Sequence, residues 1–162
     1  NHESPLRSEE FVTKKITKSL VEIKNKKIKH IDLGNLYVRR DWGYAKEYTE
    51  LFWKILQQKK PKEYVISTGE SYTIKEFVEE AAKYCGLKLK WEGKGIKERG
   101  IDIYTSKVIV RINKNFFRPT EVNTLKGNNK LIKKELSWKP KCNFKKLVKI
   151  MMEYEINEFR KN

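Results

Sequence analysis

Five stretches of the chain place apolar residues three or four positions apart, which is the spacing of one face of an α-helix. They cover residues 8–23, 45–56, 74–85, 130–136 and 144–159. Thr73 and Glu76 form a capping box at the start of the third stretch, where each side chain can bond an unpaired backbone amide. Gly86 can end the same helix in a left-handed conformation. Asp41 is the expected N-cap of the second helix.

Short apolar runs between the helices predict strands. The runs are 31–33, 64–66 and 108–112, and residues 87–91 alternate apolar and basic residues as a half-exposed strand does. Three glycines within 93–100 indicate a surface loop. The alternation of helices with strands predicts an α/β protein.

The predicted strands are too few and too short for a doubly wound sheet of their own. The chain also opens at Asn1 directly in polar, motif-like sequence, with no strand before it. No internal repeat or low-complexity linker divides it, so we expect residues 1–162 to form one unit. That unit is expected to be the end of something longer.

Composition adds a charge that invites an anionic partner. The 162 residues are 38% hydrophobic and 36% charged, and 37 Lys and Arg against 21 Asp and Glu give a net charge of +16. A packed core is therefore expected. Because the basic residues are spread along the chain, four interpretations stay open: nucleic acid, a membrane surface, a phosphate-bearing small molecule, or an ordinary solvated surface.

Cysteine spacing and hydropathy set the expected compartment. Cys85 and Cys142 match no metal-ligand spacing and no disulfide framework, so we expect no metal site and a reducing cytoplasm. No stretch approaches the roughly 18 apolar residues of a membrane span, and residues 1–5 lack the apolar run of a signal peptide. We expect a cytoplasmic protein with no membrane partner.

Seven short strings stand at intervals along nearly the whole chain. They are Asn-His-Glu-Ser-Pro at 1–5, Phe-Val-Thr-Lys-Lys-Ile at 11–16, Leu-Gly-Asn at 33–35, Arg-Asp-Trp-Gly at 40–43, Tyr-Val-Ile-Ser-Thr-Gly-Glu at 64–70, Phe-Phe-Arg-Pro-Thr-Glu-Val at 116–122 and Leu-Ser-Trp-Lys-Pro at 136–140. Any one string is weak, but as an ordered set they resemble the GDP-mannose 4,6-dehydratase family of the extended short-chain dehydrogenase/reductase superfamily.

The resemblance implies the C-terminal portion of such an enzyme over residues 1–162, with the last elements of the Rossmann sheet and the smaller substrate-binding domain. It implies the conversion of GDP-mannose into GDP-4-keto-6-deoxymannose and water, the first step towards GDP-fucose. In that reaction NADP⁺ takes a hydride from the sugar C4, water leaves across C5 and C6, and the hydride returns to C6. A homo-oligomer, either a dimer or a tetramer, is also implied for the complete enzyme.

Seven residues stand at family positions that contact GDP-mannose, whose phosphates need cations and whose rings need directed hydrogen bonds. They are Asn1 and Lys15 for the diphosphate, Arg40 and Arg118 for phosphate or ribose, Glu121 for the ribose hydroxyls, and Phe11 and Val12 for the wall of the nucleotide pocket. From the residues alone, Lys15 could equally be a solvated helix lysine and Arg40 could pair with Asp41.

Two further residues, His2 and Arg7, resemble family positions that touch the dinucleotide cofactor, where an arginine suits the extra phosphate of NADP. Leu6 departs from the family, which usually carries another arginine there. The resemblance therefore implies NADP as cofactor, with most of its contacts made outside these residues.

The family's catalytic features are not found here. The reaction requires a Gly-rich dinucleotide turn and a Tyr-x-x-x-Lys pair. Tyr84 and Lys88 have that spacing, but Gly86 lies between them and ends the helix. We expect no catalytic residue in this chain, and a fragment that needs an N-terminal Rossmann half as partner. Without that half, a sheet edge and apolar helix faces would be exposed.

Two other functions compete with this interpretation. A non-enzymatic nucleic-acid-binding module would use the charge and the aromatics Trp42, Trp53, Trp91 and Trp138. It would need exposed aromatics on a basic face, whereas Trp53 lies inside a helical stretch and is expected to be packed. A reductase or epimerase of another nucleotide sugar would lack the string at residues 1–5. We therefore expect no nucleic-acid partner.

Overall fold

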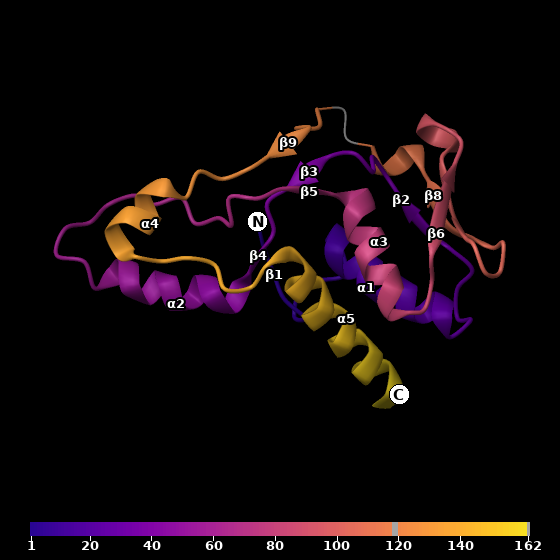
Figure 1. The fold of residues 1–162 in the computed structure, drawn as a ribbon, viewed down its shortest axis with the longest axis horizontal. Coiled ribbons are helices and arrows are strands. Elements are labelled where there is room, and N and C mark those ends of the chain that lie inside the picture. Colours follow the sequence, from indigo (N-terminus) through magenta and orange to yellow (C-terminus); the bar gives the residue numbers. More distant parts are fainter. Residues whose placement is uncertain (118–119, 162) are drawn as a thin grey trace.

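The computed structural model describes residues 1–117 and 120–161, which form a broad body and a narrower arm (Figure 1). The helices within these ranges are α1 (Val12–Lys24), α2 (Ala45–Leu56), α3 (Ile74–Tyr84), α4 (Lys130–Leu136) and α5 (Phe144–Lys161). α1, α3 and α5 pack together in the body, whereas α2 and α4 lie in the arm. All five predicted helices are confirmed, and the first begins at Val12 rather than at residue 8.

The strands of the described residues form three small sheets. They are β1 (His2–Glu3), β2 (Ile31–Leu33), β3 (Arg39–Arg40), β4 (Gly43–Tyr44), β5 (Tyr72–Thr73), β6 (Leu89–Glu92), β7 (Arg99–Asp102), β8 (Val108–Ile112) and β9 (Thr124–Leu125). The largest sheet has the order β2-β8-β7-β6, with β2 and β8 parallel and the other neighbours antiparallel. β3 lies between β5 and β9, and β1 pairs with β4 alone. The α/β class predicted from the sequence is confirmed.

Two of the strand and loop predictions are wrong. Residues 64–66 join no ladder with another described strand, and the Tyr64 hydroxyl bonds Glu135 on α4 at 2.7 Å instead. Apolar residues favour a strand, but they do not supply the neighbouring strand it needs. The loop predicted at 93–100 ends early, because Gly100 lies inside β7. A Cβ atom there would lie 3.1 Å from the Trp91 ring and from the Val110 Cβ atom, so the close packing of this strand favours a glycine.

The main core lies where α1, α3 and α5 meet the four-stranded sheet. α3 shows best how the sequence builds it. The apolar stripe that it buries consists of Ile74, Phe77, Val78, Ala81 and Ala82. The predicted capping box is confirmed, since Thr73 Oγ1 accepts a hydrogen bond from the Glu76 amide at 3.0 Å and Glu76 Oε2 accepts one from the Thr73 amide at 2.6 Å. Gly86 follows the helix with φ +74°, as predicted.

α2 buries only part of its apolar surface. The second, smaller core that it shares with α4 consists of Tyr48, Leu51, Ile132 and Trp138. On the adjoining side of α2, the side chains of Phe52, Trp53 and Leu56 are 48%, 65% and 79% exposed. The expectation that Trp53 is packed is therefore wrong, because the apolar face of this helix is wider than the small core beside it.

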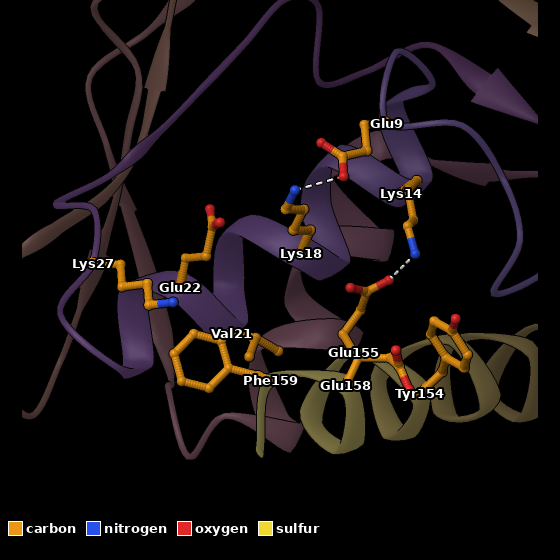
Figure 2. Close-up of a pocket in the computed structure, with 10 residues that line it drawn as sticks. All are labelled: Glu9, Lys14, Lys18, Val21, Glu22, Lys27, Tyr154, Glu155, Glu158 and Phe159. Atoms are coloured by element: carbon orange, nitrogen blue, oxygen red, sulfur yellow. Dashed lines mark hydrogen bonds and ion pairs between the residues drawn. The ribbon is translucent and has the colours of Figure 1, made fainter. Parts of the chain in front are cut away.

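A buried ion pair joins α1 to α5. Lys14 Nζ donates to a carboxylate oxygen of Glu155 and, at 2.9 Å, to the carbonyl oxygen of Pro5. Figure 2 shows this pair in the groove between the two helices, where Lys18 and Glu9 form a more exposed pair. The charges of both pairs are thus satisfied within the molecule. The buried pair connects residues 141 positions apart, so it fixes α1 against α5.

Replacing Lys14 by Met should lower the free energy of unfolding by about 3–5 kcal/mol, because Glu155 would stay buried without a counter-charge. Urea denaturation followed by circular dichroism measures the change. The matched control is Lys18→Met, which breaks the exposed pair and should cost less than about 1 kcal/mol. Adding Glu155→Leu to Lys14→Met should recover most of the loss, and equal costs for the two single variants would contradict this assignment.

Candidate functional site

β3 is the meeting point of three chain segments that are far apart in the sequence (Figure 1). It pairs antiparallel with β5 and parallel with β9, and each of the three strands is only two residues long. These ladders place the motif residues 40–43 beside residues 67–73 and 121–125. The site is therefore assembled by loops that follow or precede very short strands.

Arg40 is half-buried at this meeting point, and its guanidinium is already partly engaged. Nη1 donates to the carbonyl oxygens of Arg39 at 2.9 Å and Val122 at 2.8 Å, and Nη2 donates to Glu121 Oε1 at 3.0 Å. An arginine carries five N–H donors, so two have no partner among the residues that the structure describes. Arg40 pairs with Glu121, so the alternative of a local ion pair with Asp41 is not formed.

Asp41 turns away from Arg40 and binds two other loops. Its Oδ1 accepts from the Thr68 amide at 2.8 Å and from the Thr68 hydroxyl at 2.5 Å. Its Oδ2 accepts from the amides of Gly69 at 2.9 Å and Gly127 at 3.1 Å. The expectation that Asp41 caps α2 is wrong, because these donors take up its carboxylate and Tyr44 is the residue that precedes the helix.

Three predicted site residues, Arg7, Phe11 and Lys15, lie around the start of α1, and Phe116, which was not predicted as a site residue, contacts Lys15; we call these four residues the α1 cluster. Arg7 Cζ lies 3.3 Å from the centre of the Phe11 ring, and Lys15 Nζ lies 3.7 Å from that of Phe116. Lys15 Nζ also donates to the carbonyl oxygen of Asp32 at 2.7 Å. Burial lowers the pKa of Lys15, and the Asp32 charge opposes that shift. Two cations and two exposed rings thus alternate on this surface.

The segment 113–122 connects the α1 cluster to Arg40. Phe116 contacts Lys15, and Glu121, five positions later, contacts Arg40. Five residues of extended chain span at most about 18 Å, so the Cα atoms of Phe116 and Glu121 lie within that distance of each other.

Asn1 and His2 lie beside the loop that follows Arg40. The Asn1 carbonyl oxygen accepts from the Gly43 amide at 3.2 Å, and His2 stands opposite Gly43 in the parallel pair of β1 and β4. Partial burial lowers the pKa of His2, and the positive charge of Arg7 adds to this effect. Near neutral pH this imidazole is therefore largely uncharged.

Among the described residues, Val12 is a predicted substrate residue that joins neither group. Val12 is half-buried and packs against the main core, and Arg118 lies outside the described residues. Sequence reasoning also missed the loops that Asp41 binds. Residues 67–69 and Gly127 are turn-forming types, which signal loops but do not show which loops meet.

The tryptophans do not form the aromatic basic face that a nucleic-acid module would need. Trp42 and Trp138 are buried, and Trp91 Nε1 donates to Glu79 at 2.7 Å, which leaves Trp53 as the exposed one. Across residues 1–117 and 120–161, no group of three or more His, Cys, Asp or Glu side chains could hold a metal ion. No helix in the same ranges is long and apolar enough to cross a membrane.

Comparison with known proteins places this arrangement in a family. The profile of the family described as GDP-mannose 4,6 dehydratase matches residues 1–151. The GDP-mannose 4,6 dehydratase of Drosophila melanogaster is 48% identical over 162 residues, and that of Homo sapiens is 41% identical over 162 residues. These alignments cover the whole chain but 41% and 44% of the relatives, so the chain spans less than half of their length.

Solved structures show the same fold at low sequence identity. RMD from Pseudomonas aeruginosa, complexed with NADPH, is 15% identical with a TM-score of 0.77, over 98% of this chain and 46% of that one. The dTDP-glucose 4,6-dehydratase of Bacillus anthracis, in complex with NAD, is 16% identical with a TM-score of 0.69, over 98% and 42%. The fold is therefore that of the C-terminal portion of extended short-chain dehydrogenases/reductases.

Gly127 should tolerate no side chain, because a Cβ atom there would lie 2.3 Å from the Ser67 Cβ atom. We expect Gly127→Ala to lower the free energy of unfolding by about 1–3 kcal/mol, measured by urea denaturation. Ser67→Gly should relieve part of this loss in the double variant, since it removes the atoms that clash. Gly86→Ala is the control: it has φ +74° but no atom within 4 Å, so its cost should not depend on Ser67.

Proposed function

The chain belongs to the GDP-mannose 4,6-dehydratase family, and from this membership we propose that it supplies the GDP-mannose-binding part of that enzyme. The reaction proposed is the conversion of GDP-mannose into GDP-4-keto-6-deoxymannose and water. The observation that carries the proposal is the convergence of three family motifs at β3, where Arg40 contacts Glu121 and the adjacent Asp41 binds Thr68 and Gly69. This contact brings a cation and a carboxylate to one half-buried point.

The chemistry of this contact suits a nucleotide sugar. The two N–H donors of Arg40 that have no partner among the described residues can bind phosphate oxygens, which is the strong, charge-assisted type of hydrogen bond. Glu121 gives one carboxylate oxygen to Arg40 and keeps the other for ribose hydroxyls. Because the Arg40 guanidinium lies 3.0 Å from this carboxylate, the pair can accept hydrogen bonds without repelling the phosphates as a lone anion would.

The α1 cluster suits the rest of the ligand. Lys15 offers positive charge to the diphosphate, and the exposed rings of Phe11 and Phe116 offer apolar faces on which a base can stack. We propose that Asn1 and Arg118 complete the phosphate contacts and that Val12 backs the nucleotide pocket, as their family positions imply.

NADP is the cofactor that we propose for the complete enzyme. When bound, it supplies the hydride acceptor and donor of the reaction. His2 and Arg7 are the residues of this chain that would hold it, and the extra phosphate of NADP requires a cation such as Arg7. Arg7 fits that role because its only ion pair among the described residues, with Glu3, is a loose one at 3.6 Å. Leu6, fully in solvent, adds no charge there.

Catalysis is proposed to need a second part, the N-terminal Rossmann half. Tyr84 is the last residue of α3, and Gly86 turns the chain before Lys88, so these two residues do not share a helix. Tyr84 and Lys88 therefore cannot form the helical Tyr-x-x-x-Lys pair that the proton transfer of the family reaction needs. We propose that this chain is catalytically incomplete by itself. The complete enzyme is proposed to be a cytoplasmic homo-oligomer.

The uncovered face of α2 is where we propose that this half docks. Phe52, Trp53 and Leu56 make an apolar stripe of the kind that marks a protein interface. β1 and β4 form a parallel pair of two residues each, and parallel strands normally lie inside larger, covered sheets. A half that adds strands to this pair and covers α2 would complete both features.

Arg40→Ala should weaken GDP-mannose binding by about 10- to 100-fold, because about 1.5–3 kcal/mol rests on hydrogen bonds to a charged group of this kind. Isothermal titration calorimetry of the chain, alone and mixed with the Rossmann half of a relative, measures the affinity. Arg99→Ala, which removes the same charge from β7, should leave the affinity unchanged. Equal weakening by both variants would mean that only net charge attracts the ligand, and the assigned site would be wrong.

Trp53→Asp should block assembly with the Rossmann half while leaving the melting temperature of this chain nearly unchanged, because the side chain is exposed before assembly. Sedimentation of the mixed halves and recovery of dehydratase activity are the two measurements. Lys54→Asp, on the charged side of the same helix, should assemble normally. Assembly of Trp53→Asp with unaltered affinity would place the interface elsewhere.

A further inference from the structure

Asp41 is a buried carboxylate that holds three chain segments at one point. Asp41 is 4% exposed. Its carboxylate accepts hydrogen bonds from the amides of Thr68, Gly69 and Gly127 and from the hydroxyl of Thr68. Hydrogen bonds from neutral donors to a charged acceptor are stronger than those between neutral groups. The carboxylate can therefore organise all three segments without a cation beside it.

The bond to Gly127 extends a ladder that is otherwise very short. In the parallel pair of β3 and β9, Arg39 stands opposite Thr124 and Arg40 opposite Leu125, and both β9 residues are exposed. Two such pairings give little stability by themselves. The Asp41 side chain adds the next attachment along the same segment, at the amide of Gly127.

The bond between Asp41 and Gly127 lies on the same segment as the residues that contact Arg40. Glu121 and Val122 reach Arg40 from the same segment, and the Arg39 amide donates to the Asn123 carbonyl oxygen at 2.7 Å. A slip of one residue in a strand pairing turns every side chain to the other face. Glu121 would then point away from Arg40.

The neighbouring residues leave little freedom at the attachment. Gly69 has φ +81°, a conformation that suits glycine and turns its amide towards Asp41. Gly127 lies so close to Ser67 that a Cβ atom would clash. The buried Asn129 amide group donates to the Ser67 carbonyl oxygen at 2.8 Å, which ties the same two segments a second time.

We infer that Asp41 is a positioning residue: its carboxylate fixes the register of residues 121–127 on β3 and so places Glu121 against Arg40. The register itself follows from the contacts above. That the positioned pair binds a sugar nucleotide rests on the proposed function.

The test compares Asp41→Asn with a matched variant, Asp102→Asn. Asp102 is also buried, at 1% exposure, but it lies at the end of β7, away from β3. Its carboxylate accepts from the Lys88 amide at 3.2 Å and from the amide and hydroxyl of Thr105 at 3.1 and 2.7 Å. Both substitutions put an amide NH₂ where donors already point, so both should lower the melting temperature. Thr68→Val, which removes one donor, is a milder third variant.

The deciding measurement is hydrogen–deuterium exchange of the peptide that covers residues 120–129, without ligand. Asp41→Asn should speed exchange there by at least about tenfold, the ratio that loss of one charge-assisted hydrogen bond gives, and Thr68→Val by a smaller factor. Asp102→Asn should leave that peptide unchanged. Unchanged exchange in Asp41→Asn, or an equal increase in Asp102→Asn, would overturn the inference.

Calorimetry with GDP-mannose is the second readout, on the chain mixed with its Rossmann half. Asp41→Asn should bind at least tenfold more weakly than Asp102→Asn, although both are destabilised. If wild type shows no binding, the proposed function fails, while the exchange result still decides whether Asp41 sets the register. If Asp41→Asn does not fold, the inference stands or falls on the exchange and affinity of Thr68→Val.

Discussion

Strands of two residues cannot hold a binding site in place by their backbone bonds alone, and the centre of this molecule contains five of them. The stability that longer ladders provide elsewhere comes here from side chains that bond to the backbone. The Asp41 carboxylate binds loops on both sides of β3, and the Arg40 guanidinium binds the segment that leads into β9. Adjacent residues of one motif thus attach both neighbouring segments to the same strand.

The helices could be predicted because their information is local. The stripe of α3, its capping box and Gly86 lie within about four turns of chain, and each predicted feature is present. The strand predicted at 64–66 failed for the opposite reason, since a strand depends on a partner that the segment itself does not encode. The prediction that Trp53 is packed was wrong for a similar reason. The sequence shows a wide apolar face on α2, but it does not show how much of that face the rest of the chain covers.

The candidate site also contains features that the sequence predicted and features that only the structure shows. The family resemblance pointed to Arg40 and Glu121 separately, and the structure brings them into contact. The role of Asp41 could not be read from the sequence, because its donors come from positions 27, 28 and 86 residues away. A short polar residue before a helix is usually a cap, and only the folded chain shows that this carboxylate is used elsewhere.

The ion pair between Lys14 and Glu155 has a consequence for the order in which the protein is made. Lys14 cannot settle into its buried position until a helix translated 141 residues later arrives to neutralise it. The packed position of α1 therefore depends on α5, whatever helical propensity α1 has by itself. Phe11 and Lys15 lie within one turn of Lys14, so a chain that lacks α5 would also lack the contact that fixes this part of the α1 cluster.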